Sequence, residues 1–320
     1  MPSSGGSRAG RLAGVGVVTH LVRPTVEQCV RAARLSEESG ADWCVLPDVL
    51  GWPDVWMALG AAARATSRIL LGPGVTNPYT RHPLATAACL ATLEAMSGGR
   101  AILGVGAGGT ELRTAAGMDR SDAPARVADL VRVVRRAAEG RAPVPFALPV
   151  PDAPVLGGAR GRRMVEAVAG CCDAVLLWGL AHGDLAAAAR RVAARGTRVA
   201  WSPLRPADGP WLPMALVYGV LNSPPPTRRR LGVGPDLEAA LRRALAEGGV
   251  DRAASLVPAE VLPEFTVGDD PEGAAAVARR LGATAIVVQA FDLSLLPDRV
   301  AWAREVAGRL LAGIRAEGAP

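Results

Sequence analysis

Three histidines and one glutamate are the side chains of this sequence best suited to proton transfer, although no acid–base pair stands out. His20 directly follows an apolar run at residues 13–19, whereas His82 lies in an Arg-His-Pro turn and His182 precedes an alanine-rich stretch. A histidine or carboxylate at a strand end can exchange a proton with a substrate. His20 is therefore the best candidate for a general acid, and Glu111 is the second. A surface or capping histidine is the alternative for His20.

A basic turn offers a different chemistry, the binding of an anion. Residues 159–163 read Ala-Arg-Gly-Arg-Arg between an apolar run and an expected helix. The free N–H groups of a helix N-terminus attract phosphate, and arginine adds paired donors. The phosphate of a cofactor is therefore expected to bind at Ala159, Arg160, Gly161, Arg162 and Arg163. A solvated basic turn is the alternative.

Two glycine-containing stretches follow buried apolar runs. Residues 72–75 read Gly-Pro-Gly-Val, and residues 104–109 read Gly-Val-Gly-Ala-Gly-Gly. Glycine at a strand end marks a bulge or a close approach of backbone, although an ordinary turn is possible at residues 72–75. The second stretch fits the GxGxxG spacing of a dinucleotide fold. No helix clearly opens after it, and no strand ends in an acidic residue about twenty positions later, so a Rossmann site is disfavoured.

Composition narrows the classes of partner. The chain has 36 basic residues, all arginine, and a net charge of +6. Most arginines lie at helical spacing among alanines, which indicates solvated faces and no nucleic-acid partner. The five cysteines are scattered without metal-ligand spacing, which predicts reduced thiols in a cytoplasmic protein and no metal site. The longest apolar run, residues 214–221, is too short to cross a membrane.

Strand and helix patterns alternate along the whole chain, which predicts a parallel sheet of the α/β class. Strands are expected at residues 13–19, 42–47, 68–71, 100–106, 154–159, 173–179, 214–221 and 285–289. Eight strands at this length favour a single (β/α)8 TIM barrel, whose site lies at the C-terminal strand ends. The barrel is expected over residues 11–313, with an irregular insertion at about 197–213, before strand seven. Residues 1–10 and 314–320 are expected to be tails, the first of them disordered.

Residues 68–83 (RILLGPGVTNPYTRHP) and 97–108 (SGGRAILGVGAG) together resemble the luciferase-like family of flavin- and deazaflavin (coenzyme F420)-dependent oxidoreductases. The likeness is to its F420-dependent methylenetetrahydromethanopterin reductase-like members, and it extends from about Gly14 to about Arg309. It implies an F420-dependent oxidoreductase, expected to act as a reductase that transfers hydride to a small organic substrate. An FMN-dependent monooxygenase and a non-catalytic barrel are the alternatives.

The resemblance also assigns roles to residues. It implies a non-proline cis peptide between Gly74 and Val75, which backs the cofactor ring, with Asn77 and Asp48 beside the ring. Ala107 and Gly108 would let the backbone approach the polar tail of the cofactor.

Trp52 would lie beside the substrate, although ordinary packing at the barrel mouth is the alternative. The sugar-phosphate dehydrogenases of the family have His and Glu where this chain has Val49 and Gly109, so that activity is doubtful. Relatives form homodimers through helices beside strands two to four. The helix at residues 84–95 offers four small residues for such a contact: Ala87, Ala88, Ala91 and Ala95.

Overall fold

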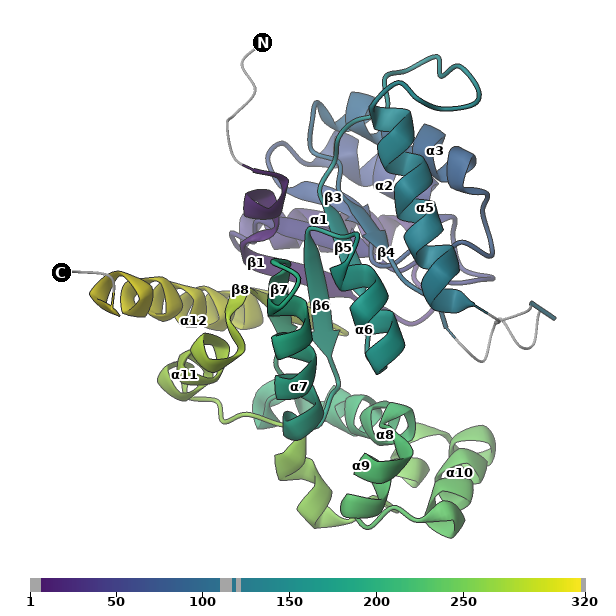
Figure 1. The fold of residues 1–320 in the computed structure, drawn as a ribbon. Coiled ribbons are helices and arrows are strands. Elements are labelled where there is room, and N and C mark those ends of the chain that lie inside the picture. Colours follow the sequence, from purple (N-terminus) through teal and green to yellow (C-terminus); the bar gives the residue numbers. More distant parts are fainter. Residues whose placement is uncertain (1–6, 110–116, 119–121, 318–320) are drawn as a thin grey trace.

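An eight-stranded parallel barrel forms the centre of the molecule (Figure 1). The structure is a computed structural model and describes residues 7–109, 117–118 and 122–317. The strands are β1 Gly14–Thr19, β2 Trp43–Leu46, β3 Leu70–Pro73, β4 Leu103–Val105, β5 Val155–Gly158, β6 Ala174–Trp178, β7 Arg198–Ser202 and β8 Ala283–Ala290. Their order is β3-β2-β1-β8-β7-β6-β5-β4. Isolated bridges from Leu71 to Ala101 and from Thr76 to Val105 bring the two edges together. The predicted (β/α)8 barrel is confirmed.

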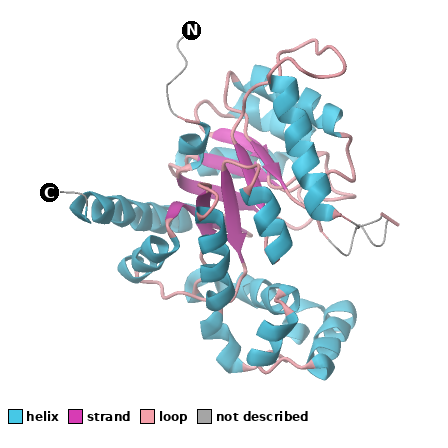
Figure 2. Ribbon diagram, in the orientation of Figure 1, coloured by secondary structure: helices cyan, strands magenta, loops and turns pink. Residues whose placement is uncertain are grey.

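Helices follow the strands and surround the sheet (Figure 2). Those of the outer layer are α1 Val26–Glu38, α2 Val55–Ala65, α3 Pro83–Ser97, α5 Ala123–Ala138, α6 Arg162–Ala169, α7 His182–Ala193, α11 Pro271–Leu281 and α12 Leu296–Glu317. Local sequence explains several of their starts. Thr25 and Gln28 form a capping box at α1, and the Asp54 and Asp270 carboxylates accept the first free N–H groups of α2 and α11.

The barrel interior is filled by large apolar side chains. Trp43 is fully buried there with Val18, Val45 and Ile102. A Cβ on Gly16 of the neighbouring strand would lie 2.1 Å from the Trp43 ring, so this position requires glycine. A second apolar layer packs between the strands and the outer helices.

Strand seven is the main error of the sequence-based assignment. The predicted strand at residues 214–221 is helix α8 Leu212–Asn222, and the stretch at 199–201, assigned to an insertion, lies within β7. Most residues of α8 are buried, so the helix shows no amphipathic period and resembles a buried strand.

The insertion therefore follows β7 instead of preceding it. It comprises η2 Pro206–Trp211, α8, α9 Pro225–Arg230, α10 Pro235–Ala254 and η3 Ala259–Glu264. These elements have an apolar cluster of their own. The β6 arrow in Figure 1 points toward them, so they lie beyond the C-terminal strand ends.

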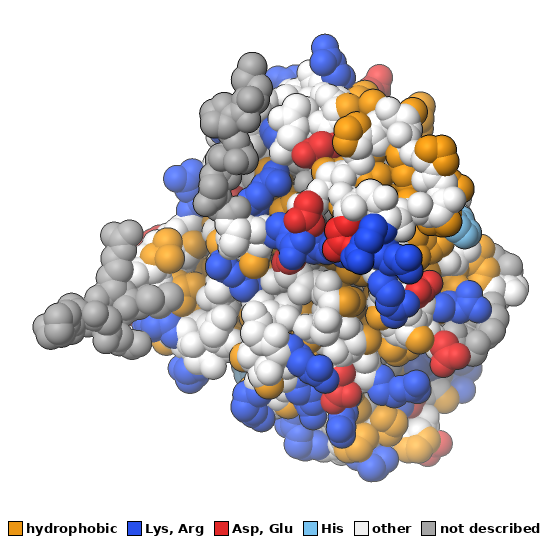
Figure 3. Space-filling model, turned by 45° about the horizontal axis from the view of Figure 1, so that its top comes forward, with side chains coloured by type: hydrophobic (Ala, Val, Ile, Leu, Met, Phe, Trp, Pro, Cys, Tyr) orange, Lys and Arg blue, Asp and Glu red, His pale blue; other side chains and the backbone are white. Residues whose placement is uncertain are grey.

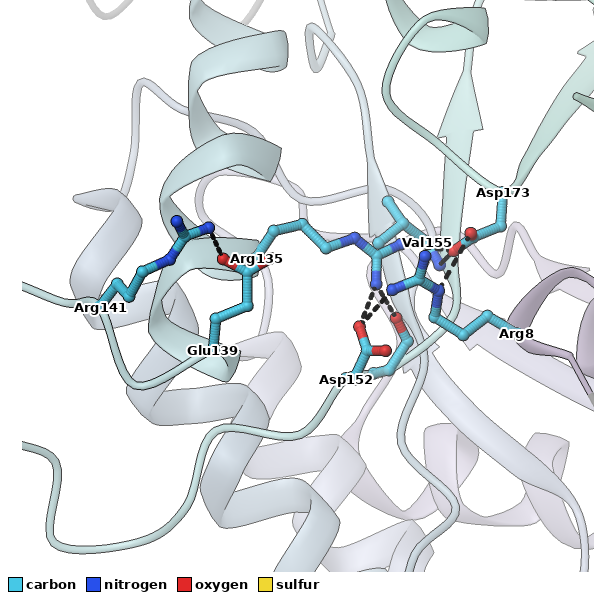
Figure 4. A network of polar contacts seen from close by, with 8 residues as sticks. Arg8, Arg135, Glu139, Arg141, Asp152, Val155 and Asp173 are labelled. Atoms are coloured by element: carbon cyan, nitrogen blue, oxygen red, sulfur yellow. Dashed lines mark hydrogen bonds and ion pairs between the residues drawn. The ribbon is translucent and has the colours of Figure 1, made fainter. Parts of the chain in front are cut away.

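The predicted N-terminal tail is partly ordered. Arg8–Leu12 forms a 3-10 helix, η1, and Leu12 is buried in the barrel interior. Arg8 lies 2.5 Å from Asp152 and 3.4 Å from Asp173, and Arg135 contacts both carboxylates at 2.7 and 2.6 Å. Figure 4 shows this network, in which Arg141 also pairs with Glu139. The ion pairs connect distant segments, which explains why the sequence alone predicted a disordered tail through residue 10.

Candidate active site

A stack of aromatic rings lies at the C-terminal ends of the strands. His20, which follows β1, stacks on Trp178 of β6 with ring centroids 5.3 Å apart and on Phe291, after β8, at 5.0 Å. Trp211 of the insertion stacks on Phe291 at 5.4 Å. His20 was predicted as a site residue, whereas Phe291 and Trp211 were missed. Phe291 could have been found from its position directly after a predicted strand, but no sequence signal places Trp211.

The environment of His20 determines its protonation. Burial lowers the pKa of His20 to about 4, a contact with the Gln289 side chain opposes the shift, and the charge of Arg160 adds to it. The imidazole is therefore neutral at pH 7. A neutral imidazole can accept a proton or donate an N–H hydrogen bond, but it holds no extra proton to give as an acid.

The arginine side chains of the basic turn after β5 point in two different directions. The Arg160 guanidinium lies 4.6 Å above the Trp178 ring, on the inner side of the mouth. Arg162 instead pairs with Glu166 at 2.9 Å on the surface, where its side chain is 73% exposed, and Arg163 is also exposed. Gly161 is the N-cap residue of α6, as predicted, and Ala159 is buried.

Several buried polar atoms around the stack lack partners among the residues that the structure describes. They are Trp178 Nε1, Trp211 Nε1 and Gln289 Oε1. Gln289 is 6% exposed, and its Nε2 donates to Ser202 Oγ at 2.8 Å, which fixes the orientation of the amide. Because a buried polar atom without a partner is costly, these three atoms indicate a place where a polar ligand would complete the hydrogen bonding.

The predicted cofactor cradle lies at the ends of β3, β4 and β5. The Gly74–Val75 peptide is cis, as the resemblance implied. Glycines surround the Val75 side chain: a Cβ on Gly106 would lie 2.7 Å from Val75 Cγ2, and one on Gly158 would lie 3.0 Å from Val75 Cγ1. A Cβ on Gly74 would meet Val45 at 2.2 Å. Val75 therefore packs directly on the backbone of Gly106 and Gly158, which leaves no room for larger residues at these two positions.

Asp48 and Asn77 lie beside this cradle, where the sequence predicted them. The Thr76 hydroxyl donates to Asp48 Oδ2 at 2.7 Å. Asn77 is 3% exposed, and its Oδ1 accepts the backbone N–H groups of Tyr79 and Thr80 at 3.0 and 3.1 Å. A Cβ on Gly108 would contact the Asn77 side chain at 3.3 Å. The carbonyl oxygen of Asn77 is thus used within the β3–α3 loop.

The remaining predicted site residues are less informative. Trp52 is partly exposed in the β2–α2 loop, and no aromatic contact within the described ranges joins it to the His20 stack. Ala107 follows β4 and is partly exposed, and Glu111 lies outside the described residues. His82 Nδ1 accepts the Leu84 N–H at 3.2 Å and caps α3, so this histidine has a structural role.

Neither a metal site nor a membrane-spanning helix is found among the residues that the structure describes. Over residues 7–109, 117–118 and 122–317, no group of three or more His, Cys, Asp or Glu side chains could hold a metal ion. Within the same ranges, no helix has the length and apolar character needed to span a bilayer.

Comparisons with known proteins agree with this geometry. Residues 5–206 match the sequence model of a family described as luciferase-like monooxygenase. The chain is 27% identical over 269 residues to the 5,10-methylenetetrahydromethanopterin reductase of Archaeoglobus fulgidus, covering 75% of this chain and 81% of that protein. It is 29% identical over 274 residues to the F420-dependent glucose-6-phosphate dehydrogenase of Beutenbergia cavernae, covering 79% and 68%. The coenzyme F420-dependent tetrahydromethanopterin reductase of Methanopyrus kandleri shares the fold, with a TM-score of 0.74, 23% identity and coverage of 94% and 99%.

Proposed function

This chain belongs to the luciferase-like monooxygenase family, and from that premise we propose that it is an F420-dependent oxidoreductase acting on a small organic substrate. The observation that carries the proposal is the glycine cradle, in which Val75 packs on Gly106 and Gly158 at the ends of three strands. The similarity to a methylenetetrahydromethanopterin reductase and to an F420-dependent dehydrogenase over three quarters of the chain supports the same cofactor.

The residues around the glycine cradle fit a cofactor with a flat ring system and a phosphate-bearing tail. Val75 would support the ring, and Asp48 and Asn77 would flank it. Ala107 and Gly108 would leave room for the tail. The N-terminus of α6, with the exposed Arg162 and Arg163, would receive its phosphate.

A bound deazaflavin supplies a ring carbon that gives or accepts a hydride. The protein must then orient the substrate, exclude water and move one proton. The neutral imidazole of His20 can accept a proton from a substrate hydroxyl during oxidation, or donate an N–H hydrogen bond to a carbonyl during reduction. The rings of Trp178 and Phe291 stack on this imidazole and cover part of it. Trp52 is proposed to border the substrate.

Titration of the purified apoprotein with F420 and with FMN, followed by fluorescence, tests the proposal. We expect saturable binding of F420 in the micromolar range or tighter. Tight FMN binding without F420 binding would favour an FMN-dependent monooxygenase. Binding of neither cofactor at high concentration would favour a non-catalytic barrel.

We further propose a homodimer formed through α2 and α3. Met57 and Met96 are 75% and 39% exposed on these helices. Of the four alanines predicted to face a partner, Ala88 and Ala95 are exposed, whereas Ala87 and Ala91 are buried.

We also propose that the protein has no nucleic-acid partner and that it is cytoplasmic. Acidic side chains lie among the arginines on the face in Figure 3, which supports solvated surfaces without nucleic acid. The five cysteines are free thiols, which supports a cytoplasmic location.

A further inference from the structure

We infer that Arg160 anchors an anionic group of the substrate, a carboxylate or a phosphate, beside His20. This inference rests on the proposed function and adds to it the chemical class of the substrate. Arg160 was predicted from the sequence to bind the cofactor phosphate together with its neighbours in the turn. Its side chain lies over Trp178 instead, at 4.6 Å, while Arg162 points away and pairs with Glu166.

Among the residues that the structure describes, none is a counter-ion of Arg160, which is partly exposed. Three buried arginines, in contrast, donate to oxygen acceptors. Arg100 bonds four backbone carbonyls and the Thr66 hydroxyl, Arg205 bonds Asp208, and Arg299 bonds two carbonyls. Arg160 has no such acceptor within the described part of the chain. Arg160 is partly exposed, yet burial lowers its pKa to about 10. Because a partly desolvated guanidinium is stabilised by an anion, this position suits an anionic ligand that the described residues do not supply.

Arg205 is a useful comparison, because its guanidinium also lies over a tryptophan ring. Its guanidinium lies 4.2 Å above the Trp302 ring, yet Asp208 lies 3.4 Å away and balances the charge. At Arg160 the aromatic contact is present, but no carboxylate among the described residues pairs with the guanidinium. An anionic ligand would provide that carboxylate or an equivalent anion.

The position of the guanidinium points to the substrate. A Cβ on Gly179 would lie 3.6 Å from the nearest guanidinium nitrogen, and the charge of Arg160 acts on His20. The guanidinium and the imidazole proposed to move the substrate proton therefore both contact the Trp178 ring and lie within electrostatic range of each other. The glycine cradle, in contrast, surrounds Val75 at the ends of β3 to β5.

An unpartnered indole N–H adds to the description of the ligand. The Trp178 N–H is a second donor near Arg160 and could bind the same anion. Gln289, whose Nε2 donates to Ser202, contacts His20 through its side chain and therefore orients the imidazole. The site thus suits a small organic acid or phosphate ester.

Calorimetric titration with benzoate and its neutral isostere benzamide tests the inference. Both probes are titrated into the free protein and into the F420-loaded protein. Wild type is compared with Arg160→Met, with Arg160→Lys and with the exposed control Arg195→Met. We expect wild type and the control to bind benzoate about tenfold or more tightly than benzamide, as a charge-assisted contact provides. Arg160→Met should bind both probes equally, and Arg160→Lys should keep part of the preference.

Two further measurements separate the possible failures. Arg160→Met should melt at the same or a higher temperature than wild type and bind F420 within about twofold of it, because it loses an unpaired, partly desolvated charge and no cofactor contact. The inference is overturned if wild type binds benzoate and benzamide with equal affinity. It is also overturned if Arg160→Met loses about tenfold or more of its F420 affinity but keeps the preference for benzoate. If wild type bound no F420, the proposed function would fail, and the titration of the free protein would still decide whether Arg160 is an anion site.

Discussion

His20 and Trp178 stack across the barrel mouth with their ring centroids 5.3 Å apart. His20 directly follows β1, whereas Trp178 is the last residue of β6. Three strand ends meet at this point, because Phe291 after β8 also stacks on His20. These rings bury part of the imidazole, and burial is the main reason why its pKa falls to about 4. The lowered pKa of His20 should therefore affect the pH dependence of both stability and activity.

His20 should make the fold less stable in mild acid. In the unfolded chain its pKa is near 6.5, and in the folded protein it is about 4. Between these values the unfolded state binds more protons, so stability is fully present above pH 6.5, falls as the pH drops toward 4, and then levels off. The loss should reach roughly 3 kcal/mol. Urea unfolding across this range should show that His20→Gln lacks this part of the pH dependence and that the exposed His182→Gln keeps it.

Turnover should depend on the same imidazole. His20→Ala should keep F420 affinity near wild type and slow turnover by roughly 10²–10⁴-fold if His20 carries the proton. In wild type, kcat/KM for substrate oxidation should fall as the pH drops through about 4, because the base becomes protonated. An unchanged rate in the variant would leave His20 as a packing residue.

Gly106 should be essential for cofactor binding. A Cβ there would lie 2.7 Å from Val75 Cγ2 and 3.2 Å from the Gly158 carbonyl oxygen. Gly106→Ala should therefore displace Val75 and weaken F420 binding about tenfold, since overpacking of this kind costs on the order of 1–3 kcal/mol. Gly308→Ala, which has open space in α12, is the control and should leave F420 affinity unchanged. Equal F420 affinity in both variants would contradict the proposed cradle.

Asp173 should contribute more to stability than Asp152, although both carboxylates pair with Arg8 and Arg135 (Figure 4). The Asp173 side chain is 12% exposed and also accepts the Val155 N–H at 2.8 Å, whereas that of Asp152 is 59% exposed. Asp173→Ala should lower the free energy of unfolding by roughly 2–3 kcal/mol and Asp152→Ala by less than about 1 kcal/mol. Urea denaturation of both variants compares the two costs.

The proposed dimer can be tested at two exposed apolar positions. Met57 on α2 is 75% exposed and Leu311 on α12 is 58% exposed. Light scattering at micromolar concentration should give twice the chain mass for wild type and Leu311→Asp. Met57→Asp should give the mass of one chain, because a buried aspartate at the interface would be desolvated. A monomeric wild type would refute the dimer.

The strength of each local signal determined how much of the fold could be predicted. The alternation of strands and helices held over most of the chain because most crossover helices, such as α1, α5, α6 and α11, have one apolar face. It failed at α8, which is buried on most sides and so lost its period. The β7 strand was missed because its apolar core is short and lies directly before Pro203.

The site was predictable where it follows strand ends in sequence. His20, Asp48 and Asn77 lie at the barrel mouth for this reason. The different directions of Arg160 and Arg162 could not be read from a turn in which the arginines look alike. Contacts between distant segments decide them, namely Trp178 for Arg160 and Glu166 for Arg162.

The boundary of the insertion has a consequence for how this enzyme could diversify. The family match ends at residue 206, where η2 begins, and the following segment packs around its own apolar cluster. Trp211 from this segment nevertheless contacts Phe291 at the barrel mouth. Substitutions at Trp211 would therefore change the barrel mouth next to His20 from outside the barrel, whereas the glycine cradle around Val75 is built from β3, β4 and β5. The lining of the mouth and the cradle can thus vary independently.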